Sequence, residues 1–243
     1  MAIRPETLLL SAGDSACFYV GPLAPWRLGV RSSWSVDGLP AAATADARGP
    51  MAVTPPGGCL RIDASCALAD GQYPLDVTAA VPGTTWNAQV TLATAACQEF
   101  KPGVYTGSMN ELMDVIVAGK PAFTHGLVVP LRVCCSSQPR KLVVTIESAT
   151  SEAGTPLTEP PRFFLFCSLV RPAPDFIDAH NAEFSNVEKD YATNSGWKLE
   201  ETVTPGLYLL VFEHDSFIDL VHPRPPGDVP QSVTYRLEMV DLP

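Results

Sequence analysis

The sequence has few charged residues and, for its length, many prolines. Asp, Glu, Lys and Arg together make up 17% of its 243 residues, against about 25% in an ordinary soluble domain. Its 24 prolines are roughly twice the usual share of about 5%. This composition argues against long helices and coiled coils, which need many charged helix formers and few prolines. Since 46% of the residues are hydrophobic, it also argues against a disordered chain.

The sequence also lacks long apolar runs, CxxC motifs and Asn-x-Ser/Thr glycosylation sites. No stretch approaches the roughly 20 apolar residues of a transmembrane helix, and the run Leu8–Leu10 is too short for a signal peptide. The seven cysteines are odd in number and irregularly spaced, which is not typical of a disulfide framework. We therefore expect free thiols and a reducing, cytoplasmic location.

The acidic charge is concentrated in the second part of the chain. The formal net charge is −10; residues 1–150 carry 11 acidic and 10 basic side chains, and residues 151–243 carry 15 and 6. An acidic surface repels nucleic-acid phosphates and anionic membranes, so neither is an expected partner. The asymmetry indicates a basic protein partner or a cation for the second half, although a merely solvated acidic face would have the same composition.

Short stretches with alternating apolar residues recur along the chain and end at Pro or Gly, as half-buried strands do. The predicted strands are Thr7–Ser11, Ala16–Val20, Trp26–Trp34, Leu60–Cys66, Leu75–Val81, Asn87–Thr94, Leu127–Cys135, Leu142–Ser148, Phe163–Val170, Trp197–Val203, Leu207–Phe212 and Val233–Val240. Two segments, Asn110–Ala118 and Asp175–Tyr191, could be helical. The sequence thus predicts an all-β fold of the sandwich type with one or two short helices.

One motif occurs twice and suggests how the strands divide into domains. Phe100–Tyr105 and Val203–Tyr208 both read apolar-x-Pro-Gly-apolar-Tyr, with an offset of 103 residues. That offset is about the length of one β-sandwich. We therefore predict two tandem antiparallel β-sandwich domains, residues 1–119 and 120–243. Chance recurrence of the motif in a Pro- and Gly-rich β protein is the alternative.

The segment from Val128 onward resembles the C2-like domain III of calpains and their non-peptidase relatives. The likeness lies in the order of the strands from Lys141–Ser148 to Val233–Val240 and in the run Thr204–Val211. In that family a Pro-Gly-x-Tyr turn leads into a buried strand near the end of the domain. The calpain catalytic cysteine lies in a Gly-Asp-Cys-Trp context that none of the seven cysteines has. The resemblance therefore implies a binding or scaffolding module without a peptidase domain.

Two further motifs resemble the first and last blocks of GDSL-type serine hydrolases. These are Gly13-Asp14-Ser15 and Asp219-Leu-Val-His222. On this resemblance Ser15 would be the nucleophile, His222 would accept its proton, and Asp219 would orient the imidazole. That family has a doubly wound α/β fold whose crossover helices this sequence does not predict. A serine esterase is therefore the alternative function.

A calcium- or carbohydrate-binding module is the second alternative. Acidic residues gather in two stretches: Asp175, Asp178, Glu183, Glu188 and Asp190, and then Glu213, Asp215, Asp219 and Asp228. Calcium prefers such loop carboxylates, although neither stretch has EF-hand spacing. The tryptophans Trp26, Trp34, Trp86 and Trp197 could line a sugar platform, but a tryptophan in a sandwich strand more often anchors the core.

These patterns together predict a non-catalytic structural or interaction protein, a scaffold or adaptor. The calpain-like resemblance implies membership of a large intracellular assembly, so we expect a cytoplasmic location in association with the cytoskeleton. The expected partner is a protein, with basic residues that contact the acidic second half. We assign no catalytic, cofactor-binding or metal-binding residue and expect no cofactor.

Overall fold

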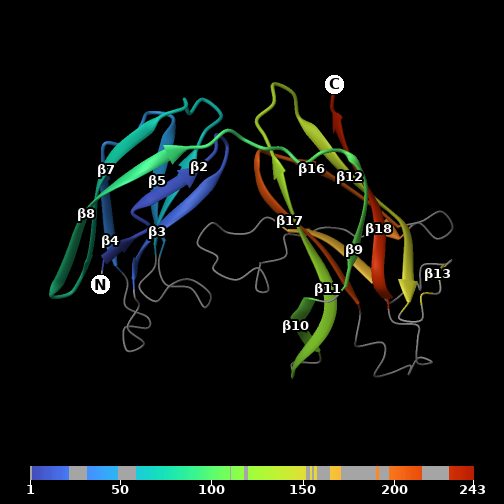
Figure 1. Cartoon of the computed structure of the whole chain (residues 1–243). Coiled ribbons are helices and arrows are strands. Elements are labelled where there is room, and N and C mark those ends of the chain that lie inside the picture. The colour runs from blue at the N-terminus through green and yellow to red at the C-terminus, as the bar shows by residue number, and fades with distance from the viewer. Residues whose placement is uncertain are drawn as a thin grey trace. The chain divides into compact units, whose positions relative to one another are not determined.

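The computed structural model describes residues 2–21, 32–48, 59–109, 111–117, 120–151, 154, 156–157, 165–170, 190–191, 197–214 and 230–243. All regular secondary structure in these ranges is β-strand, which confirms the predicted all-β class (Figure 1). The predicted strands overlap observed ones, although most of Trp26–Trp34 lies outside the described residues. The described residues contain no helix that could cross a membrane.

The described residues up to Gln98 form one compact unit of two four-stranded sheets. The first sheet is antiparallel and has the order β1 (Ala2–Arg4), β3 (Ser15–Gly21), β6 (Cys59–Ala64), β5 (Ala43–Arg48). The second has the order β2 (Thr7–Leu10), β8 (Thr84–Thr94), β7 (Gln72–Val81), β4 (Ser33–Asp37), with β2 parallel to β8. Alternate residues such as Phe18 and Ile62 on the first sheet and Leu75 and Val77 on the second share one buried core, as the period of a strand requires.

The described residues from Glu99 onward form a second unit, also of two sheets and antiparallel throughout. One sheet has the order β10 (Glu111–Val117), β11 (Lys120–Val133), β17 (Gly206–His214), β14 (Leu165–Val170). The larger sheet has the order β15 (Asp190–Tyr191), β16 (Trp197–Val203), β12 (Arg140–Ser151), β18 (Pro230–Asp241), β9 (Gly103–Ser108), and β13 (Pro156–Leu157) also pairs with β12. Leu142, Leu210, Phe212 and Leu237 lie in the buried core of this unit.

The division between the units differs from the predicted boundary at residues 119 and 120. Tyr105 in β9 lies opposite Tyr235 in β18, and β10 forms a hairpin with β11. Both strands therefore complete sheets of the second unit, whereas the sequence assigned them to the first. Independent folding of the two units remains a prediction.

The helix predicted at Asn110–Ala118 is wrong, because Glu111–Val117 forms strand β10. Its apolar residues fit either period, and its β-branched run Val115–Val117 favours a strand. The deciding contact is the hairpin with β11, in which Val117 lies opposite Lys120. The second predicted helix, Asp175–Tyr191, lies outside the described residues except for β15 at its end.

Three tyrosines close turns that lead into strands. The hydroxyl of Tyr208 donates to the carbonyl of Thr204 at 3.0 Å and accepts the N–H of Thr204 at 3.0 Å. The hydroxyl of Tyr105 donates to the carbonyl of Lys101 at 2.5 Å, and that of Tyr73 to the carbonyl of Ala69 at 2.9 Å. A tyrosine bonded to the backbone a few residues upstream is the tyrosine corner of β-sandwiches.

These corners change the meaning of the repeated motif. Both copies found in the sequence, Phe100–Tyr105 and Val203–Tyr208, belong to the second unit. The corner of the first unit is Leu68–Tyr73, where Asp70 takes the place of proline. All three corners have a glycine at the same position, and of these Gly206 has a φ of 140° that other residues rarely adopt. The offset between the two copies therefore does not measure the length of a repeated domain.

Candidate functional site

Ser15 begins β3 and lies opposite Asp63 of β6. Its hydroxyl donates to the Asp63 carboxylate and accepts a hydrogen bond from Nη2 of Arg61 at 3.3 Å. Arg61 in turn pairs through Nε with Oδ1 of Asp63 at 2.7 Å. Ser15 is thus held in a polar cluster across two strands. Asp219 and His222 lie outside the described residues, so the GDSL-like triad remains a prediction.

The acidic residues considered as calcium ligands fall mostly outside the described ranges. Only Asp190, in β15, and Glu213, in β17, are placed, and for both the backbone alone is described. Among the residues that the structure describes, no group of three or more His, Cys, Asp or Glu side chains could hold a metal ion. Calcium binding therefore remains a prediction.

Two of the four tryptophans pack against the core of the first unit. Trp34 in β4 and Trp86 in β8 lie on either side of Ala79 in the sheet, and Ala79 is fully buried. The indole N–H of Trp34 donates to Oγ of Ser32 at 2.8 Å. Both rings are half-buried and pack against the core, and carbohydrate binding remains a prediction. Trp26 and the side chain of Trp197 lie outside the described residues.

The cysteines contradict the prediction of seven free thiols. Cys66, Cys97, Cys134 and Cys135 are disulfide-bonded, and Cys17, Cys59 and Cys167 are thiols. The odd number of cysteines does not exclude disulfides, because four bonded cysteines and three thiols also add up to seven. Disulfides persist in oxidising compartments and are rare in the cytosol. The predicted cytoplasmic location is not tested by these bonds and remains a prediction.

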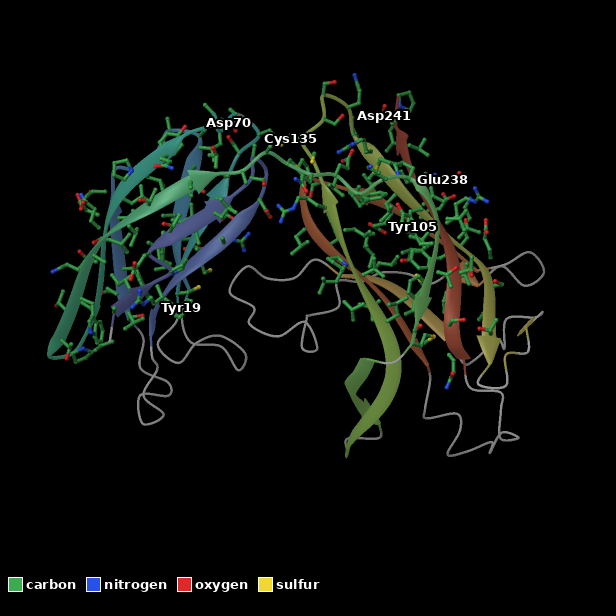
Figure 2. The ribbon with its side chains drawn as sticks, in the orientation of Figure 1. Tyr19, Asp70, Tyr105, Cys135, Glu238 and Asp241 are labelled. Carbon is green, nitrogen blue, oxygen red and sulfur yellow. The ribbon has the colours of Figure 1, made fainter. Side chains whose placement is uncertain are left out.

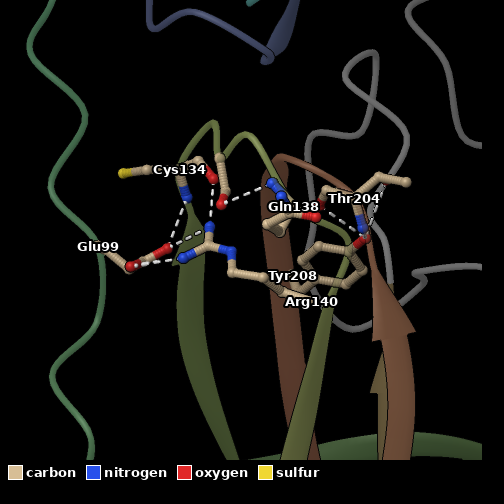
Figure 3. A network of polar contacts seen from close by, with 7 residues as sticks. Glu99, Cys134, Gln138, Arg140, Thr204 and Tyr208 are labelled. Carbon is tan, nitrogen blue, oxygen red and sulfur yellow. Dashed lines mark hydrogen bonds and ion pairs between the residues drawn. The ribbon is translucent and has the colours of Figure 1, made fainter. Parts of the chain in front are cut away.

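A bidentate ion pair lies where the second unit begins (Figure 3). Nη2 of Arg140 lies 2.7 Å from Oε1 of Glu99, and Nη1 donates to Oε2 at 3.0 Å. Nη2 also donates to the carbonyl of Cys134, whose N–H donates to Oε1 of Glu99 at 2.9 Å. The side chain of Arg140 is only 10% exposed and that of Glu99 is 32% exposed. The pair thus ties the start of the unit to the segment between β11 and β12.

The same contacts set the ionisation of Glu99. Partial burial acts to raise its pKa, but the hydrogen bonds from Arg140 and from the Cys134 N–H, together with the charge of Arg140, outweigh that effect. The pKa of Glu99 consequently lies below its usual value of 4.5. The next residue, Phe100, donates its N–H to the carbonyl of Arg132 at 3.2 Å. These bonds fix the chain just before β9.

Strand β9 is an edge of the larger sheet, and among the described residues it pairs only with β18. Its sequence, Gly-Val-Tyr-Thr-Gly-Ser, contains neither charge nor proline. Val104 is 48% and Tyr105 37% exposed, and the Tyr105 ring stacks on Tyr235 with centroids 5.8 Å apart. Exposed edges are usually blocked by charge, proline or shortness, because their backbone groups can pair with another chain. The sequence of β9 therefore carries neither blocking charge nor proline, and no described strand covers this edge. The uncharged run Gly103–Ser108 is the feature of the sequence from which this edge could have been predicted.

No protein-family model matches this sequence, and no curated protein is significantly similar to it. The function must therefore be argued from the chain's own geometry. Tyr208–Phe212 form a buried run after the Pro-Gly turn, as the resemblance to calpain domain III implies. A tyrosine corner gives many sandwiches the same feature, so the resemblance remains a prediction.

Gly107 allows β9 to pack against β11. A Cβ at this position would lie 2.3 Å from Cδ2 of Leu127, whereas a Cβ at Gly103, on the same strand and face, would lie 3.7 Å from the Tyr105 ring. We expect Gly107→Ala to destabilise the second unit by about 1 kcal/mol, because the half-buried Leu127 side chain must shift to make room. Gly103→Ala is the matched control with little effect. Equal shifts of the two variants in urea unfolding would contradict the close approach of β9 and β11.

Proposed function

We propose that this chain is a non-catalytic interaction protein whose partner adds a strand to β9. The observation that carries the proposal is the uncharged, six-residue edge with exposed Val104 and Tyr105. In an antiparallel sheet alternate residues direct their N–H and C=O groups to one neighbour, so half of those of β9 do not face β18. An extended segment would bond to them, and its side chains would contact Val104 and Tyr105.

The charge around β9 favours a different protein over a second copy. The net charge of −10 opposes association of two identical chains. Gly103, at the start of β9, lies opposite Leu237, and β18 continues past it with the exposed carboxylates Glu238 and Asp241 (Figure 2). Two basic residues lie near this end of the sheet. Lys101 precedes β9 by two residues, and Arg236 of β18 forms an ion pair with Glu147. Basic residues beside the added segment would therefore complement this end of the sheet.

Two cellular compartments are candidates for the place where this chain binds its partner. The sequence predicts a cytoplasmic scaffold associated with the cytoskeleton. The four disulfide-bonded cysteines instead favour an oxidising compartment. Strand addition works equally in both, since it uses backbone groups and a small apolar surface. The partner should be sought in both fractions of the source cell.

Two lysine substitutions test the proposal on the full chain. Val104→Lys places a charge on the β9 edge, and the control Leu9→Lys places the same charge on β2 of the first unit, where the leucine is 65% exposed. A partner captured by the native chain and by Leu9→Lys should be lost with Val104→Lys. Its binding should slow amide hydrogen exchange across Gly103–Ser108.

Three outcomes would overturn the proposal. These are equal capture by Val104→Lys, no slowing of exchange in β9, and capture of no protein at all. A dimer in sedimentation that Val104→Lys dissociates would instead make the partner a second copy of the chain. Circular dichroism of both variants shows whether each keeps its fold.

A further inference from the structure

The sulfur atoms of Cys17 and Cys59 are in direct contact across two paired strands. Cys17 lies in β3 and Cys59 in β6, and the neighbouring pairs Cys17 with Arg61 and Phe18 with Leu60 fix the register. Cys59 is therefore two residues from the position opposite Cys17, on the same face of the sheet. Their Sγ atoms are 2.9 Å apart. The backbone pairing of the two strands holds this arrangement in place.

The distance between the two sulfur atoms is shorter than a van der Waals contact and longer than a disulfide bond. Non-bonded carbon atoms pack at about 3.5–4.0 Å, and sulfur is larger than carbon. A disulfide bond is about 2.05 Å long. No heavy atom can lie between the two sulfurs at 2.9 Å. Bond formation therefore requires the removal of two protons and two electrons and an approach of the sulfurs by a further ~0.9 Å.

We propose that Cys17 and Cys59 form a third disulfide, by exchange with a disulfide oxidant. The oxidant is a small-molecule disulfide such as oxidised glutathione, or an enzyme of the thiol–disulfide oxidoreductase class. This modification site is independent of the strand-addition surface on β9. It leaves Cys167 as the single thiol, which accounts for the odd number of cysteines.

The burial of the two residues sets the order of the exchange. Cys59 is fully buried and Cys17 is partly exposed, so the Cys17 thiolate attacks the oxidant first. One sulfur of the oxidant leaves, and a mixed disulfide forms. The Cys59 thiolate then attacks Sγ of Cys17 and releases the second sulfur. Two thiol protons and two electrons pass in total to the oxidant, whose disulfide becomes two thiols.

Thiol counting on the denatured full-length chain tests the proposal. After treatment with oxidised glutathione, the native chain should fall from three thiols to one, and a tryptic digest should contain the peptides of Cys17 and Cys59 joined. Cys167→Ser is the matched control and should lose its two remaining thiols in the same way. Cys17→Ser should keep both of its thiols, Cys59 and Cys167.

A thermal measurement complements the count, because a cross-link between β3 and β6 restricts the unfolded chain. The oxidised native chain should unfold at a midpoint at least about 5 °C above the unoxidised one, with no such rise in Cys17→Ser. Cys17→Ala replaces Cys17→Ser if the serine variant does not fold. A count that stays at three, or a digest that joins Cys17 to another cysteine, would overturn the proposal.

Discussion

Glu99→Gln is expected to destabilise the second unit by about 2 kcal/mol at neutral pH. The substitution keeps the shape of the side chain but removes its charge, and Arg140 is left 10% exposed beside a neutral amide. Breaking a fully buried pair costs about 3–5 kcal/mol. Because Glu99 is 32% exposed, solvent screening reduces that figure. Urea unfolding followed by circular dichroism measures the change.

Glu200→Gln is the matched control for that substitution. Hydrogen bonds from Lys141 and Lys198 lower the pKa of Glu200 to about 2. Like Glu99, Glu200 therefore forms close ion pairs, here with two lysines. It stands on the exposed face of β16, however, where such pairs contribute little to stability. We expect a much smaller shift in its urea midpoint. Equal shifts for Glu99→Gln and Glu200→Gln would show that the burial of Arg140 does not matter.

The lowered pKa of Glu99 also predicts how stability varies with pH. A carboxyl whose pKa is lower in the folded than in the unfolded state stabilises the fold above the unfolded value. That contribution is complete above about pH 4.5 and is lost as the pH falls through the lower, folded pKa. As the pH falls below about 4.5, the native chain should therefore lose this contribution to stability, whereas Glu99→Gln, which lacks the carboxyl group, should not show that loss. Parallel curves for both proteins would contradict the assignment.

Tyr208→Phe is expected to destabilise the second unit by about 2 kcal/mol. Its hydroxyl is 3.0 Å from both the N–H and the carbonyl oxygen of Thr204, and the side chain is only 7% exposed. Phenylalanine would fill the same space and remove both hydrogen bonds, each of which contributes about 1 kcal/mol. Tyr73→Phe and Tyr105→Phe each remove one hydrogen bond at a more exposed corner. We expect about 1 kcal/mol or less for each of them.

The three tyrosine variants also test whether the two units fold independently. Tyr73 belongs to the first unit, and Tyr105 and Tyr208 belong to the second. If the units are separate domains, Tyr73→Phe should lower one thermal transition in calorimetry and Tyr208→Phe the other. One transition that both variants lower together would mean that the units unfold as one. Equal losses for all three tyrosines would contradict the role of burial at the Tyr208 corner.

Local sequence patterns predicted much of the fold. The predicted strand Trp197–Val203 has the same bounds as β16, and the alternation in Leu75–Val81 matches the buried residues of β7. These patterns succeed because one face of each strand is buried. They fail where an apolar run fits either period and cross-strand pairing decides, as at β10, which forms a hairpin with the next strand, β11.

The candidate sites depended more on distant contacts and were mostly missed. The partners of Ser15 are Arg61 and Asp63, 46 and 48 residues away. The contact between Cys17 and Cys59 spans 42 residues and follows from the register of two strands, which a single sequence does not contain. The corner at Tyr73 was missed for a local reason, because Asp70 stands where the other two copies have proline.

The position of Glu99 at the start of the second unit has a consequence for cutting the chain. A fragment from Lys120 onward, the boundary that the sequence suggested, would lack β9 and leave the backbone of β18 open along Ser232–Leu237. It would also separate Arg140 from its carboxylate partner. Such a fragment would combine an unsatisfied cation with a bare sheet edge, two properties that promote aggregation. An expression boundary just before Glu99 keeps both the strand and the ion pair.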